Sequence, residues 1–145
     1  MQKIKHLLYV PFVGLGNFGG WRGSRWFKNR LQIFRQFVVP SLLNQTNQDF
    51  IIWISFTPEL KNNSLIIELK QYLNEVGLKS YFSFHGICFW DDKYSDVIAR
   101  DRLLTSLHDT LGEMTDVIGE ADYVYMTITP SDDLYHKDAV QVIQT

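Results

Sequence analysis

Residues 7–13 read LLYVPFV, a continuous apolar run that Gly14 closes. A strand buried on both faces has this pattern, whereas a strand with one face in water alternates apolar and polar residues. A second such run, FIIWISF, occupies residues 50–56. Two further strands are expected near residues 80–84 and 123–129, where apolar and aromatic residues again dominate. The chain therefore supplies four candidate strands.

Helical patterns separate these strands. From Phe27, apolar residues recur at Leu31, Phe34 and Val38, and Pro40 inside this pattern predicts a kink or a break into two short helices. Two more apolar stripes at helical spacing predict a second helix and a long third one: Ile66, Leu69, Leu73 and Val76, then Leu104, Leu107, Leu111, Met114 and Ile118.

Alternating strands and helices predict an α/β fold with a mainly parallel sheet and helices on both faces, in one domain over residues 1–145. In open sheets of this kind, ligands bind beyond the carboxyl ends of the strands. Three segments are expected at that edge: Gly14–Gly23, Thr57–Glu59 and Pro130–Asp133.

Composition excludes some classes of protein. The formal net charge is −2, which argues against a nucleic-acid binder because such proteins usually carry a basic excess. The single cysteine, Cys88, excludes an internal disulfide and suits the cytoplasm. The apolar run at residues 7–13 is too short to cross a membrane, so no transmembrane segment is expected.

Asp132 and Asp133 are the strongest chemical signal. Adjacent carboxylates after a buried strand repel each other, and a divalent cation such as Mg²⁺ or Mn²⁺ would offset that repulsion. The cation would also bridge to phosphate oxygens. The alternative is a solvated turn or a helix N-cap, because aspartate is favoured in both positions.

Weaker patterns have structural alternatives. Residues 14–19 spell GxGxxG, but the first acidic residue after them is Asp49, which disfavours a dinucleotide site; a loop that folds over a ligand fits better. Arginines such as Arg30 and Arg100 could bind phosphate or belong to solvated helix faces. The grouping of His85, Cys88, Asp91 and Asp92 matches no zinc spacing and is interpreted as a loop.

Two blocks of sequence point to a family. The first has R-x-x-x-F from Arg30, then PSLLNQT over residues 40–46 and DF at residues 49–50. The second has SDDL over residues 131–134. In this order the blocks resemble the rhamnosyltransferase-like family of bacterial glycosyltransferases, which are inverting enzymes with the Rossmann-like A fold.

The resemblance implies a metal-dependent glycosyltransferase that moves a sugar, with rhamnose as a candidate, from a nucleotide-sugar donor to a saccharide acceptor. By matched position it implies Asp132 and Asp133 as ligands of Mn²⁺ or Mg²⁺, and Arg30 and Ser131 as nucleotide-sugar-binding residues. Arg100 is a further nucleotide-sugar-binding candidate, because arginine grips phosphate bidentately.

Two positions depart from the family pattern. Pro130 stands where the family has the first aspartate of its D-x-D motif, so the carboxylate expected near the donor ribose is absent. Where related enzymes often end the second strand with an aspartate that contacts the base, this chain has Thr57-Pro58-Glu59, which makes Glu59 the substitute candidate. The sequence identifies neither the sugar, the base and the acceptor, nor the catalytic base.

The chain length leaves other functions open. Inverting enzymes of this group normally carry the acceptor-binding half and the general base beyond the acidic block, so we expect a truncated sequence. A binding-only or inactive nucleotide-sugar-binding domain is the alternative, which Pro130 also favours. A metal-dependent nuclease or phosphohydrolase is a third hypothesis, but it would usually need more acidic ligands.

Overall fold

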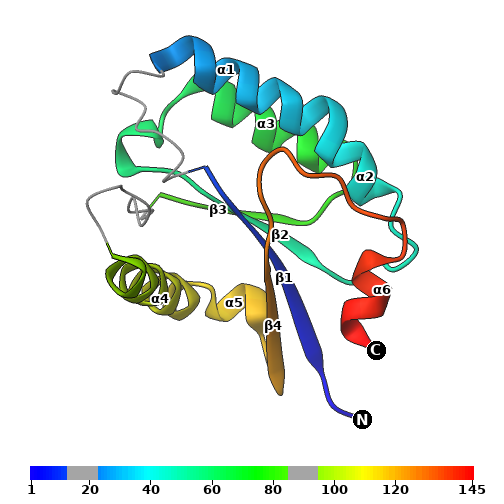
Figure 1. The fold of residues 1–145 in the computed structure, drawn as a ribbon. Coiled ribbons are helices and arrows are strands. Elements are labelled where there is room, and N and C mark those ends of the chain that lie inside the picture. Colours follow the sequence, from blue (N-terminus) through cyan, green and yellow to red (C-terminus); the bar gives the residue numbers. More distant parts are fainter. Residues whose placement is uncertain (13–22, 85–94) are drawn as a thin grey trace.

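The computed structural model describes residues 1–12, 23–84 and 95–145 (Figure 1). Its centre is one four-stranded sheet in which every neighbouring pair is parallel, with the order β3-β2-β1-β4. The strands are β1 (Ile4–Pro11), β2 (Ile51–Ser55), β3 (Ser80–Ser83) and β4 (Tyr123–Ile128). The parallel sheet and the four strands are confirmed where the apolar runs predicted them.

Helices cover both faces of the sheet (Figure 1). One face carries α1 (Gly23–Ile33), the π-helical turn η1 (Phe34–Val38), α2 (Val39–Leu43), α3 (Ser64–Glu75) and α6 (Ala139–Gln144). The opposite face carries α4 (Asp96–Glu113) and α5 (Thr115–Ile118). The short 3₁₀ turn η2 (Pro58–Leu60) follows β2. No helix among the described residues is long and apolar enough to cross a bilayer.

Alternate residues of β1 supply the two halves of the core. Leu8 and Val10 pack under the α1 and α3 side, while Leu7 and Tyr9 pack under α4. All four are at most 2% exposed. Burial on both faces is why residues 7–11 of this strand are apolar at every position rather than at every second one.

The helix that contains Pro40 differs in detail from the prediction. The chain does not break at the proline; α1 passes through η1 directly into α2. Proline lacks the backbone N–H of the helical hydrogen bond and its ring crowds the preceding turn. Pro40 lies in the first turn of α2. The π-helical turn η1 widens the helix just before it and so accommodates the proline ring.

The predicted long third helix is wrong in two respects. It ends at Glu113, and α5 begins after Met114, which is buried at the junction. Leu104 was predicted on the core stripe but is 55% exposed, whereas Leu107 is buried. The helix therefore packs on the sheet mainly through its second half.

His6 of β1 is a buried polar group with a complete set of partners. Its Nδ1 accepts a hydrogen bond from the Gln144 side-chain amide of α6 at 3.3 Å. Nε2–H is therefore free to donate to the Thr127 hydroxyl of β4 at 2.9 Å. Protonation of Nδ1 would place a second donor against the Gln144 amide, so the neutral ring fits this position.

Acidification should therefore destabilise the fold through His6. Burial lowers the pKa of its imidazole, and the charge of Asp49 offsets part of that effect. The stabilisation is full above the unfolded pKa of about 6.5 and is lost as the pH falls from that value through the lower pKa of the folded protein. Urea unfolding between pH 7.5 and 5 should show a steeper loss in the wild type than in His6→Gln. Equal slopes would contradict this role.

Candidate functional site

The acidic turn lies at the carboxyl edge of the sheet, beside the central strand β1. From β1 the chain builds outward through β2 to β3, and then returns to place β4 on the other side of β1. Such a reversal of strand order opens the crevice in which α/β proteins bind ligands. Thr129, just past β4, is buried, and its N–H donates to the Tyr9 carbonyl at 2.7 Å. The turn therefore begins from a fixed point at the carboxyl edge of the sheet.

Asp132 is joined to Arg30 of α1 by an ion pair. The Arg30 side chain is only 15% exposed and that of Asp132 is 44% exposed, so the pair lies at the boundary of the interior. The Arg30 guanidinium also lies 5.2 Å from the centre of the Trp26 ring, within reach of a cation–π contact. The structure thus brings together two predicted site residues that are far apart in the sequence.

This ion pair leaves binding capacity on both partners. Arg30 contacts Asp132 through one terminal nitrogen of its guanidinium, which has five N–H donors in all. The ion pair involves one oxygen of the carboxylate, and its other oxygen could act as an acceptor or metal ligand. An anion and a cation can therefore both approach this pair.

Ser131 carries an unsatisfied polar group next to the ion pair. Ser131 is 0% exposed, and its Oγ has no hydrogen-bond partner among the described residues. An unpaired buried hydroxyl costs about 1–3 kcal/mol, so its presence calls for an explanation such as a bound water or a ligand. The role of Ser131 in binding a nucleotide sugar stays a prediction.

Glu59 lies in η2, just beyond the carboxyl end of β2. Hydrogen bonds from its own backbone N–H and from the Thr57 hydroxyl lower the pKa of its carboxyl group, which is fully ionised at neutral pH. Only β1 separates β2 from β4, so the two strand ends are about 10 Å apart. Glu59 is exposed at the same edge as the acidic turn, and its contact with a base stays a prediction.

Arg100 lies in the second turn of α4. It is exposed and contacts the neighbouring carboxylate of Asp101 at 3.2 Å. Within the described part of the chain, the structure does not join Arg100 to the pair of Arg30 and Asp132. Its predicted role at the site is untested.

The described carboxylates fit a metal ion that is shared with a ligand. Asp133 is exposed beside Asp132, and residues 1–12, 23–84 and 95–145 contain no group of three or more metal-ligating side chains. Mg²⁺ is often held by one or two carboxylates together with substrate phosphates. Asp132 and Asp133 are therefore described residues that could hold such an ion together with a diphosphate.

Two sequence predictions fall outside the described residues. They are the glycine-rich loop, apart from Gly23, and the loop that contains His85, Cys88, Asp91 and Asp92.

Tyr135 is a residue near the site that the sequence patterns missed. Burial raises the pKa of its phenol; a hydrogen bond with Thr129 opposes this shift and the charge of Asp133 adds to it. The aromatic ring packs against the core on the α1 side of the sheet. The position of Tyr135, two residues after Asp133, is a sequence signal that could have predicted its packing against the core.

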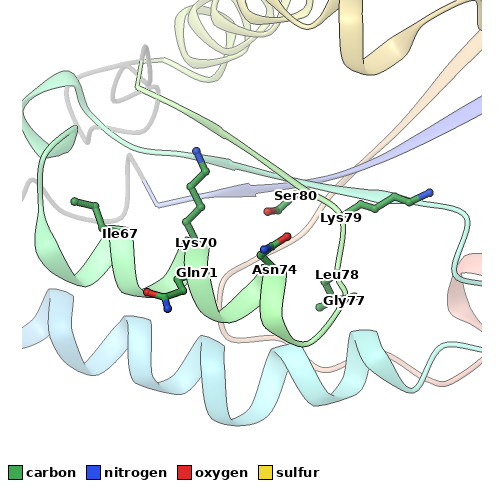
Figure 2. Close-up of a pocket in the computed structure, with 8 residues that line it drawn as sticks. All are labelled: Ile67, Lys70, Gln71, Asn74, Gly77, Leu78, Lys79 and Ser80. Atoms are coloured by element: carbon green, nitrogen blue, oxygen red, sulfur yellow. The ribbon is translucent and has the colours of Figure 1, made fainter.

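A second hollow lies away from the acidic turn. A surface cavity of about 630 Å³ lies between α3 and the amino end of β3 (Figure 2). Lys70, Lys79 and Ser80 are among the residues that line it. Because ligands of parallel α/β sheets bind at the carboxyl edge, the acidic turn is the better candidate for the functional site.

Comparisons with known proteins identify one family. No curated protein and no solved structure matches the chain. The matching family model covers residues 23–76, which include Arg30 and the PSLLNQT block. Through these residues, the chain matches the family described as "Putative rhamnosyl transferase", as the resemblance in its sequence predicted.

Proposed function

We propose that this chain binds the nucleotide-sugar donor of a cytoplasmic, metal-dependent glycosyltransferase, with rhamnose as the candidate sugar and a saccharide as acceptor. The observation that carries the proposal is the ion pair between Arg30 and Asp132. It links the segment that matches the family to the acidic turn at the carboxyl edge of the sheet. One cationic and one anionic group at that edge suit a diphosphate and its metal ion.

The chemistry required is the stabilisation of a leaving group. The acceptor hydroxyl attacks the anomeric carbon, the bond from that carbon to the phosphate oxygen breaks, and the hydroxyl proton passes to a base. Negative charge then grows on the nucleoside diphosphate. Mn²⁺ or Mg²⁺ would be held by Asp132, with Asp133 in support, and would supply positive charge there.

Arg30 would bind the same diphosphate through its remaining N–H donors. Its guanidinium is held by Asp132 on one side and Trp26 on the other, so little side-chain freedom is lost when a phosphate arrives. Donors fixed in this way stabilise charge without reorganising as it develops. Glu59 would face the base and Ser131 the donor.

A binding-only domain is the second candidate. Pro130 replaces one acidic position of the family pattern, and Arg30 already neutralises part of the charge on Asp132. Such a domain would bind nucleoside diphosphates but would neither transfer nor hydrolyse the sugar. A nuclease or phosphohydrolase would instead release phosphate or cleave nucleic acid in the presence of Mn²⁺.

Calorimetry tests the proposal directly. The wild type is titrated with dTDP, UDP and GDP, with and without Mn²⁺, and with the matching nucleoside monophosphates. Mn²⁺-dependent binding of at least one diphosphate is expected, with weaker binding of its monophosphate. Sugar release from the corresponding nucleotide sugar separates the enzyme from the binding-only domain. If none of these three diphosphates binds, the proposal is wrong.

Arg30→Gln should weaken diphosphate binding by tenfold or more, or about 1.4 kcal/mol, because a charged hydrogen bond to phosphate is lost. Arg35→Gln is the matched control. Arg35 lies on the same helical segment, but its guanidinium stacks 4.1 Å from the centre of the Tyr72 ring. Equal losses in the two variants, measured by calorimetry, would show a general charge effect and not a contact.

A further inference from the structure

Hydrogen bonds join the segment that follows the acidic turn to the end of α2. We propose that Gln45 is a positioning residue that sets the acidic turn, and with it Asp132, for binding the metal and diphosphate. This inference rests on the proposed function, but its structural part can be tested without it. It also assigns a physical role to the glutamine of the PSLLNQT block.

The side chain of Gln45 is buried, at 4% exposed, and makes three hydrogen bonds. Its Nε2 donates to the His136 carbonyl at 2.8 Å and to the Ser41 carbonyl at 3.1 Å. Its Oε1 accepts from the Val140 N–H at 3.1 Å. Every hydrogen of the amide is used, and the side chain ties α2 to a segment far along the chain.

The bond to Val140 caps a helix. Val140 lies in the first turn of α6, where backbone N–H groups have no partner within the helix. The bond to His136 satisfies a carbonyl just before that helix. A glutamine suits both tasks because it offers donors and an acceptor, whereas a glutamate would place a carboxylate oxygen against carbonyl oxygens.

Neighbours of Gln45 hold the same segment. The Thr46 N–H donates to the Lys137 carbonyl at 2.8 Å, and the Thr46 hydroxyl donates to Asp138 at 2.9 Å. The Ser41 hydroxyl accepts from the Tyr135 N–H at 3.4 Å. Gln45 is the most buried of the three, so its bonds exchange least with water.

The acidic turn is thus fixed at both ends. Before it, the Thr129 N–H is bonded to the Tyr9 carbonyl at 2.7 Å. After it, Gln45 holds the His136 carbonyl. Between these points Asp132 is held by its ion pair with Arg30. When the second anchor is released, the backbone of the turn gains freedom and Asp132 loses its fixed position.

The test compares Gln45→Ala with Gln48→Ala. Gln48 donates to the carbonyls of Leu42, Leu43 and Gln45, at 3.1, 3.1 and 2.8 Å. It therefore supports the same end of α2, but its three bonds do not reach the segment after the turn. Both substitutions remove three hydrogen bonds, and only Gln45→Ala removes bonds to the segment that follows the acidic turn.

Binding of the nucleoside diphosphate selected with the wild type is measured by calorimetry with and without Mn²⁺, well below the melting temperature of each variant. Gln45→Ala should weaken Mn²⁺-dependent binding at least tenfold and binding without Mn²⁺ much less. Gln48→Ala should keep the affinity within twofold. Wild-type affinity in Gln45→Ala, or equal losses in both variants, would overturn the positioning role.

Hydrogen exchange keeps the inference independent of nucleotide binding. The amides of residues 131–140 should exchange faster in Gln45→Ala than in the wild type, and at the wild-type rate in Gln48→Ala. If the wild type binds no diphosphate, the proposed function fails, and exchange still decides whether Gln45 fixes the turn. If Gln45→Ala does not fold, Thr46→Val should accelerate exchange in the same residues; unchanged exchange would overturn the inference.

Discussion

Trp53→Ala should lower the free energy of unfolding by about 3–5 kcal/mol, the usual effect of removing a large aromatic side chain from a core. Trp53 is 1% exposed, and its ring centre lies 4.3 Å from that of Tyr9. Its indole N–H donates to the Ser83 hydroxyl at 2.9 Å. The substitution therefore leaves both a cavity and a buried hydroxyl without its donor. Urea denaturation with the midpoint and slope fitted separately measures this loss.

Two controls separate packing from other effects. Trp53→Phe keeps an aromatic ring and loses the N–H, so it should cost only about 1–2 kcal/mol. Tyr123→Ala removes an aromatic ring that is 50% exposed on β4 and should change stability by about 0.5 kcal/mol or less. A Trp53→Ala protein with an unchanged melting temperature that had lost ligand binding would show instead that Trp53 is a binding platform.

The sheet could be predicted from sequence because burial on both faces leaves a local pattern. β2 is buried at all five of its positions, and its sequence is correspondingly apolar. The prediction failed where packing depends on distant partners. Leu104 fits the helical stripe, yet it is exposed because α4 contacts the sheet mainly beyond it.

The components of the site could be predicted, but their arrangement could not. Arg30 and Asp132 were each proposed from residue chemistry and from the family resemblance. Their ion pair depends on the position of α1 over the carboxyl ends of β1 and β4, which follows from the strand order. A single sequence does not encode that order in any local pattern.

The role of the PSLLNQT block was likewise hidden. Its residues lie within the stretch that matches the family model, but the hydrogen bonds of Gln45 join positions about ninety residues apart. A buried glutamine in such a block is a usable signal, because buried amides must be hydrogen-bonded. The burial of Gln45 does not, however, predict that its partners are His136 and Val140.

Asp132→Asn should abolish the Mn²⁺-dependent part of nucleoside diphosphate binding, a loss of about 100-fold or more, equal to about 2.7 kcal/mol. Asparagine keeps the size of the side chain and one oxygen acceptor, but it removes the charge that a hard divalent cation requires. The fold should survive, because ion pairs near the surface contribute only about 0–1 kcal/mol and Asp132 is 44% exposed. Calorimetry with and without Mn²⁺ measures the effect.

The ion pair between Arg30 and Asp132 predicts different effects of Asp132→Asn on binding with and without Mn²⁺. In Asp132→Asn the Arg30 guanidinium loses its anionic partner but keeps its place against Trp26, so it remains free to bind a phosphate. Diphosphate binding without Mn²⁺ should therefore persist or strengthen while the response to Mn²⁺ disappears. Asp133→Asn, at the exposed neighbouring position, should retain most of that response. If Asp132→Asn keeps the full response to Mn²⁺, Asp132 serves only as the partner of Arg30, and the turn shapes the site without holding a metal.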